Sequence, residues 1–313
     1  MRTTIPAALL ALATALPSHA LDILVTNDDG IASPGLQALA AALDAAGHDV
    51  TVVAPADEQS GRGGAINTDV FGDFVPIVRV AANQYAVEGT PSDAVNAALN
   101  VLLAGSPPDL VVSGLNRGQN LAKITANTSG TIGAALRAAL DLGVPAIAGS
   151  VGILFAEAGD DFPSTQAAYG PAAAFMVEVV AALEAAPGDD LLPKRVKLLN
   201  VNFPVPHTSW AGVAFTKLGD RSDLEIPFFD STLGFPPFFP PLNIAPACDA
   251  IAVGQFCLAG VGVAFPPGPD TEKDADVDAH RDDFISITAM DGDMTAGTKA
   301  IDDVQDVLGG VSP

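Results

Sequence analysis

Two adjacent carboxylates follow a short apolar run near the start of the chain. Residues 21–26 read LDILVT, which predicts a buried β-strand, and Asp28 and Asp29 come directly after it. Neighbouring carboxylates repel each other unless a cation lies between them, and their oxygens are the ligands that hard divalent ions prefer. A turn in which Asn27 and Asp28 cap the next helix would use the same residues, so the dipeptide alone leaves both interpretations open.

Three further polar loops follow predicted strands: ADEQSGRGG, SGLNRGQN and NTSGT. Their candidate ligand-binding residues are Ser60, Asn116, Asn120, Ser129, Gly130 and Thr131. An Asn carbonyl can bind a hard ion and an Asn amide can donate to a phosphate oxygen, while N–H groups and hydroxyls at a helix start favour anions. Each loop alone is an ordinary turn. Four such loops after four strands predict a joint site for a metal ion and a phosphate.

Strand patterns alternate with helix patterns over most of the chain. The predicted strands are residues 21–26, 48–54, 109–113, 144–150, 196–201 and 283–288, and the predicted helices are 34–46, 91–103, 130–142 and 164–186. This alternation predicts a doubly wound α/β fold with a mostly parallel sheet. Ser33 is the expected cap of the first helix. Ligands of open α/β sheets bind beyond the carboxyl ends of the strands, where the four polar loops lie.

Composition excludes several classes of partner. The 313 residues are 49% hydrophobic, enough for a sizeable core, and 14 Lys+Arg against 37 Asp+Glu give a net charge of −23. This balance argues against binding a nucleic-acid backbone or an anionic membrane surface. A phosphorylated substrate would need a metal ion to supply local positive charge. Two Cys exclude a cysteine-rich zinc module.

The first twenty residues have the pattern of a secretory signal peptide. A cationic start is followed by an apolar run and then by Ser18-His19-Ala20, which predicts cleavage after Ala20 and export to the periplasm or the medium. The alternative is a membrane anchor, for which the run is short. No later segment is expected to span a membrane. In an oxidising compartment Cys248 and Cys257 could form a local disulfide or remain free thiols.

The amino-acid composition of the chain changes after about residue 220. Residues 226–246 are dense in Pro and Phe, which predicts an irregular segment that packs on the core or contacts another subunit. Acid-rich residues 270–283 are expected to form a solvated loop. The expected division is therefore 1–20 signal peptide, 21–220 catalytic core and 221–313 extension. His207 and His280 are not assigned to the site.

Five segments together resemble the SurE family of metal-dependent nucleotidases and phosphatases. They read LVTNDDGIASPGLQALA, VVAPADEQSG, VEGTPSDAVNAAL, PDLVVSGLNRGQNLA and TSGTIGAALRAAL. The resemblance covers residues 21–220 and a short stretch at 283–290. It implies a Rossmann-like core whose C-terminal extension serves dimer or tetramer assembly, and it implies hydrolysis of phosphate monoesters, typically nucleoside monophosphates.

The resemblance also implies roles for single residues. It places a divalent ion, Mg²⁺ or Mn²⁺, on four ligands: Asp28, Asp29, Ser60 and Asn116. It places the phosphate on Asn120 and on the turn Ser129, Gly130 and Thr131. Either Asp28 or Asp29 would take a proton from the attacking water.

Residues 121–128, LAKITANT, depart from the family, which usually has acidic residues and an aromatic before Ser129. Lys123 adds a cation near the expected phosphate or is simply exposed, so the nucleotide preference stays open. Two other functions remain possible, a broad acid phosphatase and a non-catalytic phosphate-binding module. A dinucleotide-binding Rossmann domain is disfavoured, because the first turn reads NDDGIASPG rather than G-x-G-x-x-G.

Overall fold

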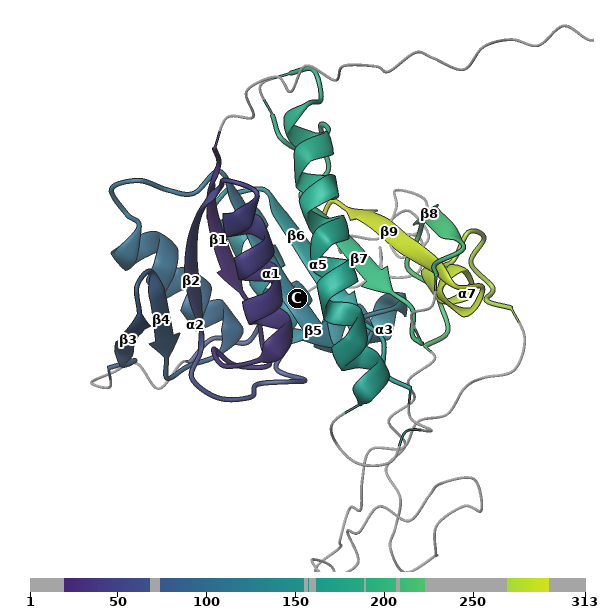
Figure 1. The fold of residues 1–313 in the computed structure, drawn as a ribbon, viewed down its shortest axis with the longest axis horizontal. Helices are drawn as coiled ribbons and strands as arrows, with labels where there is room; N and C mark the ends of the chain where they lie inside the picture. The colour runs from purple at the N-terminus through teal and green to yellow at the C-terminus, as the bar shows by residue number, and fades with distance from the viewer. Residues whose placement is uncertain are drawn as a thin grey trace, which may run out of the picture.

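The protein is described by a computed structural model that covers residues 20–67, 74–154, 157, 162–188, 190–206, 209–222 and 269–292. Its centre is a nine-stranded sheet of order β3-β4-β2-β1-β5-β6-β7-β9-β8 (Figure 1). The strands are β1 (Asp22–Thr26), β2 (Asp49–Pro55), β3 (Ile77–Ala81), β4 (Gln84–Val87), β5 (Leu110–Arg117), β6 (Ala146–Val151), β7 (Leu198–Phe203), β8 (Gly212–Thr216) and β9 (Phe284–Met290). All pairs are parallel except β3–β4 and β7–β9.

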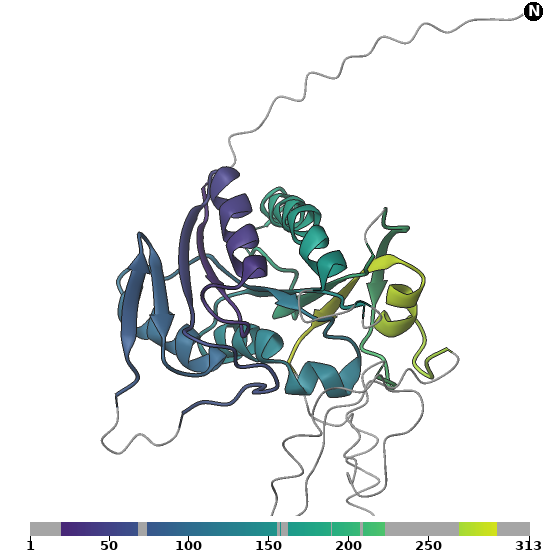
Figure 2. The ribbon, with the colours of Figure 1, turned by 60° about the horizontal axis from the view of Figure 1, so that its bottom comes forward.

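Helices cover both faces of this sheet. They are α1 (Pro34–Ala45), α2 (Pro91–Ala97), α3 (Ala122–Thr128), α4 (Gly130–Leu136), α5 (Pro163–Glu184) and α7 (Asp276–Arg281). Two π-helical turns, Ala98–Leu102 and Arg137–Asp141, continue α2 and α4. In Figure 2, α1 (purple) and α5 (green) lie on one side of the sheet and the blue and teal helices on the other. The mostly parallel α/β fold predicted from the sequence is confirmed.

The side-chain alternation of β1 explains why the strand is apolar throughout. Ile23 and Val25 pack in the cluster under α1 and α5, whereas Leu24 packs in the opposite cluster with α2 and α4. A strand covered on both faces must be hydrophobic at every position. The strand therefore runs through the middle of the core and carries Asp28 and Asp29 out at its carboxyl end.

Helix α5 corrects one expectation. By length and composition Pro163–Glu184 could cross a membrane, although no later segment was expected to. In the structure it packs along α1 and buries part of its surface in the core, including Tyr169, Met176 and Val180.

Several elements differ from the sequence prediction. Strand β5 continues to Arg117, so half of the predicted loop after it is strand. The β3–β4 hairpin, α3 and β8 were not predicted, since each is short or solvent-facing and shows little hydrophobic periodicity. Ser33 occupies the N-cap position of α1, but its hydroxyl accepts from Asn27 Nδ2 (2.7 Å) rather than capping the helix.

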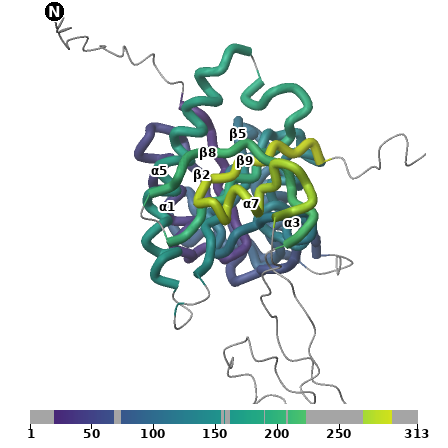
Figure 3. Tube along the Cα trace, turned by 90° about the vertical axis from the view of Figure 1, so that its right-hand side faces the viewer, coloured from purple at the N-terminus to yellow at the C-terminus, as the bar shows by residue number. Residues whose placement is uncertain are grey.

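The acid-rich run 270–283 was wrongly expected to be a solvated loop. It contains α7, and Asp276 and Val277 within it are buried. Figure 3 shows α7 beside β8 and β9 at one end of the sheet. Residues 1–19 of the predicted signal peptide, the Pro/Phe-rich segment 226–246, His207, Cys248 and Cys257 lie outside the described residues.

Candidate functional site

Asp28 and Asp29 leave β1 in a tight turn that Gly30 makes possible with a φ of +94°. Asp28 is only 2% exposed, and the Thr131 hydroxyl donates to its Oδ1 at 2.6 Å. Asp29 Oδ2 accepts from the backbone N–H of Arg117 at 2.8 Å. The two carboxylates are therefore tied to the start of α4 and to the end of β5, as the strand-end argument predicted.

Asn27, not Asp28, stabilises the turn. Its Nδ2 donates to the Gly30 carbonyl at 3.1 Å and to the Ser33 hydroxyl. The Asp28 side chain thus remains directed at Thr131. The helix-capping interpretation fits neither residue, because Asn27 Oδ1 accepts no hydrogen bond and the Asp28 carboxylate accepts from Thr131.

The loop that contains Ser60 is anchored beside Asp28. The backbone N–H of Gln59 donates to the Asp28 carbonyl at 2.7 Å, which brings the next residue, Ser60, to this end of the sheet. Ser60 is exposed, and its N–H donates to Glu58 Oε1 at 2.7 Å. Glu58 also forms an exposed ion pair with Arg117 (3.3 Å). Ser60 is the least buried of the four candidate metal ligands.

Several buried side-chain oxygens on β1, on β5 and in the turn after β1 have no hydrogen-bond partner among the described residues, and Asn27 Oδ1, Asp29 Oδ1 and Asn116 Oδ1 are three of them. Asn116 donates through Nδ2 to the Gly118 carbonyl at 2.7 Å, while its Oδ1 has no partner among the described residues. Asp29 Oδ1 is also buried and has no hydrogen-bond partner among the described residues. Buried acceptors without a donor are costly, and a cation satisfies them as a hydrogen bond would. The residues present therefore fit a hard divalent ion, whose ligands are oxygens.

Asn120 is held on all sides by polar groups. Its Nδ2 donates to the Ser150 hydroxyl at 2.9 Å and lies 3.4 Å from the Thr131 hydroxyl. Asn202 and Asn200 contact its backbone. Sequence reasoning did not find these partners, although the alternating Asn residues in LLNVNF were a visible signal in a strand that is otherwise apolar.

The turn at the start of α4 packs directly on Asp28. The Ser129 hydroxyl caps the helix by accepting from the N–H of Ile132 at 3.1 Å. A Cβ atom at Gly130 would lie 2.7 Å from Asp28 Oδ2, so a side chain there would displace the carboxylate. Thr131 uses its hydroxyl on Asp28. Both hydroxyls of the predicted phosphate turn thus contact the protein itself.

Burial dominates the electrostatics of the carboxylate pair. It raises the pKa of Asp28 to about 6, and the charge of Glu58 adds to this effect while the Thr131 hydrogen bond opposes it. Burial, followed by the charge of Asp28, raises the pKa of Asp29 to about 7. Glu58, which the sequence analysis did not single out, acts on both groups. Without a bound cation, the two negative charges therefore destabilise the folded protein at neutral pH.

The raised pKa values predict how the free energy of unfolding depends on pH when a chelator keeps the protein free of metal. Both pKa values lie above the 3.8 of an ordinary Asp, so the folded protein keeps protons that the unfolded chain has released. The loss of stability begins near the unfolded pKa of 3.8 and is complete just above the folded pKa values of about 6 and about 7, so stability should still fall as the pH is raised from 5 to 8. Urea unfolding at both pH values should show the wild type losing more stability over this range than Asp29→Asn. Parallel curves for the two proteins would contradict the buried pair.

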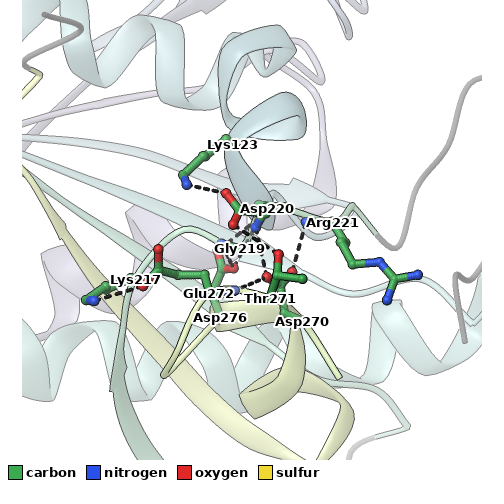
Figure 4. Close-up of polar contacts among 10 residues, drawn as sticks. Lys123, Lys217, Gly219, Asp220, Arg221, Asp270, Thr271, Glu272 and Asp276 are labelled. Atoms are coloured by element: carbon green, nitrogen blue, oxygen red, sulfur yellow. Dashed lines mark hydrogen bonds and ion pairs between the residues drawn. The ribbon is translucent and has the colours of Figure 1, made fainter. Parts of the chain in front are cut away.

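The segment after Asn120 is held by α7. Asp276, buried on that helix, accepts from the N–H groups of Ala122, Gly219 and Val277 at 2.8–3.2 Å. Figure 4 shows Asp276 beneath the Gly219 segment, next to a cluster in which Asp270 accepts from Asp220. The C-terminal segment thus supports the loop that carries Asn120.

Two other charged groups were left open by the sequence. Lys123 forms an exposed ion pair with Asp220, so its ammonium group is directed towards the cluster that contains Asp220 and Asp270. The ring of His280 is enclosed by α7 and its neighbours, and burial lowers its pKa to about 4. The imidazole is therefore neutral at pH 7. In the described part of the chain no three His, Cys, Asp or Glu side chains form a metal-binding cluster.

Comparisons with known proteins agree with this arrangement. The family model "Survival protein SurE" matches residues 23–225. A protein named 5'-nucleotidase SurE from Thermosynechococcus vestitus is 35% identical over 299 residues, covering 93% of this chain and 98% of its own. A protein of the same name from Methanocella arvoryzae is 42% identical over 204 residues, covering 64% and 73%.

A solved structure gives the same result. The SurE protein from Aquifex aeolicus superposes with a TM-score of 0.66 at 27% identity and covers 91% of this chain and 98% of its own. The family model spans well over half of the chain, and the relatives extend the match almost to both ends. The chain belongs to the SurE family.

Proposed function

We propose that this chain is a metal-dependent phosphomonoesterase that hydrolyses nucleoside 5'(3')-monophosphates to a nucleoside and phosphate. The observation that carries the proposal is that Asp29 Oδ1 and Asn116 Oδ1 are buried without a hydrogen-bond donor in the neighbourhood of the buried Asp28. Membership of the SurE family, whose relatives are named 5'-nucleotidases, supports the reaction class.

In this proposal Asp28, Asp29, Asn116 and Ser60 would hold Mg²⁺ or Mn²⁺. The ion, when bound, supplies positive charge to the phosphoryl oxygens and lowers the pKa of a bound water. The two Asp side chains and Asn116 offer their oxygens from the rigid ends of β1 and β5. Ser60 offers its hydroxyl from a loop anchored at Asp28 by Gln59.

The chain's own residues would bind the phosphate and move the proton. Asn120, with its side chain pinned by Ser150, would donate to a non-bridging oxygen. Within the turn Ser129, Gly130 and Thr131, the backbone N–H of Gly130 would bind a second oxygen, because the N–H groups of Ser129 and Thr131 donate to the Thr125 carbonyl and to Asp28. Asp28 or Asp29 would accept the proton of the attacking water. Thr131 would orient Asp28 through its hydrogen bond.

The proposal also covers the cellular location and the oligomeric state of the protein. The signal-like first twenty residues support export to the periplasm or the medium, where the enzyme would recover phosphate from external esters. The family resemblance supports a homodimer or homotetramer.

A substrate panel on the mature chain tests the function. AMP, GMP and p-nitrophenyl phosphate are each incubated with Mg²⁺ or Mn²⁺, with and without EDTA, and phosphate release is measured. We expect release from the nucleotides that EDTA abolishes and added metal restores. Equal release from p-nitrophenyl phosphate would indicate a broad phosphatase. Nucleotide binding without release would indicate a binding module, and release that survives EDTA would contradict the metal site.

A further inference from the structure

Two asparagines in the middle of β7 hold the backbone of Asn120 like a clamp. Asn202 Oδ1 accepts from the Asn120 N–H at 2.7 Å, and Asn202 Nδ2 donates back to the Asn120 carbonyl at 3.3 Å. Asn200 Nδ2 donates to the same carbonyl at 2.8 Å. Both side chains are 0% exposed. A strand buried on both faces ordinarily carries aliphatic residues at these positions. Burying two amide side chains there costs free energy, which suggests that they have a function.

We propose that Asn200 and Asn202 are positioning residues that fix Asn120 for phosphate binding. The inference rests on the proposed function, because it takes Asn120 as the phosphate donor. It adds a task for two residues that neither the sequence motifs of the site nor the metal ligands include.

The sheet register shows how the clamp works. Ser150 on β6 is the direct neighbour of Asn202 on β7, and Asn120 lies across this pair. Its side-chain Nδ2 donates to Ser150 while its backbone N–H donates to Asn202. Both the main chain and the side chain of Asn120 are thereby fixed by adjacent positions of the rigid sheet. One amide hydrogen goes to Ser150 at 2.9 Å and the other to the Thr131 hydroxyl at 3.4 Å, and this second, long and therefore weaker bond is the one that a phosphate oxygen would replace.

The clamp requires a carboxamide. The Asn202 side chain donates to and accepts from the same residue, as a paired backbone would, and neither a carboxylate nor an aliphatic group can do both. A loop held only by its own backbone would leave Asn120 several orientations, and catalytic groups lose efficiency when their support is loose. Asn202 closes both bonds, and Asn200 strengthens the one to the carbonyl.

Three variants of the full mature chain test the proposal. Asn202→Ala removes both bonds, Asn200→Ala removes one, and Thr288→Val is the control. Thr288 on β9 is the register neighbour of Asn200 and shares a part-buried hydrogen bond with Thr216 (2.7 Å), but its hydroxyl makes no hydrogen bond to Asn120. Each protein is assayed for kcat and KM on AMP with added metal, for the Ki of inorganic phosphate and for its unfolding midpoint in urea.

We expect Asn202→Ala to lower kcat/KM by about 10- to 100-fold, with the Ki of phosphate rising, and Asn200→Ala to cause a smaller change in the same direction. Thr288→Val should lose comparable stability and keep kcat/KM and Ki within about twofold. If both Asn variants match Thr288→Val in kcat/KM and Ki, the residues are merely structural and the proposal is overturned. Should Asn202→Ala fail to fold, the comparison of Asn200→Ala with Thr288→Val decides.

The proposed function can fail separately from this inference. If the wild type releases no phosphate from any ester, the function is wrong, and the inference is then judged on phosphate binding measured by calorimetry. Weaker phosphate binding by the Asn variants than by Thr288→Val would still support the clamp. Unchanged phosphate binding would overturn it.

Discussion

Asp29→Asn is expected to lower phosphate release from nucleotides by roughly 1000-fold, equivalent to about 4 kcal/mol of transition-state stabilisation. The substitution keeps the size of the side chain but removes its charge, and Asp29 Oδ1 is a buried oxygen without a hydrogen-bond donor. An amide there would bind a divalent ion weakly and could not accept a proton from water. Initial rates at saturating AMP and metal measure the effect.

A matched control removes a charge from the same neighbourhood without touching the pair. Asp57 lies exposed at the start of the Ser60 loop, and Asp57→Asn should keep activity within about twofold. The expectation for Asp29 fails if Asp29→Asn and Asp57→Asn have similar rates. Such a result would place the proton acceptor and the ion elsewhere.

Asp276→Ala is expected to cost at least about 3 kcal/mol of unfolding free energy. The carboxylate is buried and accepts from three backbone N–H groups, so its removal leaves three donors without a partner (Figure 4). Ala122, one of these donors, has a left-handed φ of +61° that the hydrogen bond helps to hold. Urea unfolding followed by circular dichroism measures the loss.

Asp282, just past the end of the same helix, supplies the comparison. It is exposed, and Asp282→Ala should change the unfolding free energy by no more than about 0.5 kcal/mol. A folded Asp276→Ala protein should also have a higher KM for AMP, because the segment after Asn120 loses its support. Equal unfolding curves for the two variants would show that Asp276 does not hold this segment.

The sequence sufficed for the parts of the fold that follow simple periodicity. The buried run of β1, the alanine-rich α1 and the strand-helix alternation predicted the parallel sheet and the end at which its ligands bind. The candidate residues Asp28, Asp29, Asn116 and Asn120 come to that end because parallel strands finish at one edge. These predictions needed no knowledge of distant contacts.

The contacts that could not be predicted join residues that are far apart in the sequence. Asp276 reaches Ala122 across 154 residues, and Asn202 reaches Asn120 across 82. No local pattern in the acid-rich run distinguishes a buried Asp276 from its exposed neighbours. The same holds for Thr131, whose hydroxyl turns to Asp28 rather than outward. Tertiary packing decides each of these contacts.

The most direct measurement of the central claim is anomalous diffraction from a crystal of the mature chain grown with Mn²⁺. We expect one strong peak with oxygens of Asp28, Asp29 and Asn116 within roughly 2.0–2.6 Å. A peak held by other residues, or no peak at these three side chains at saturating Mn²⁺, would contradict the central claim.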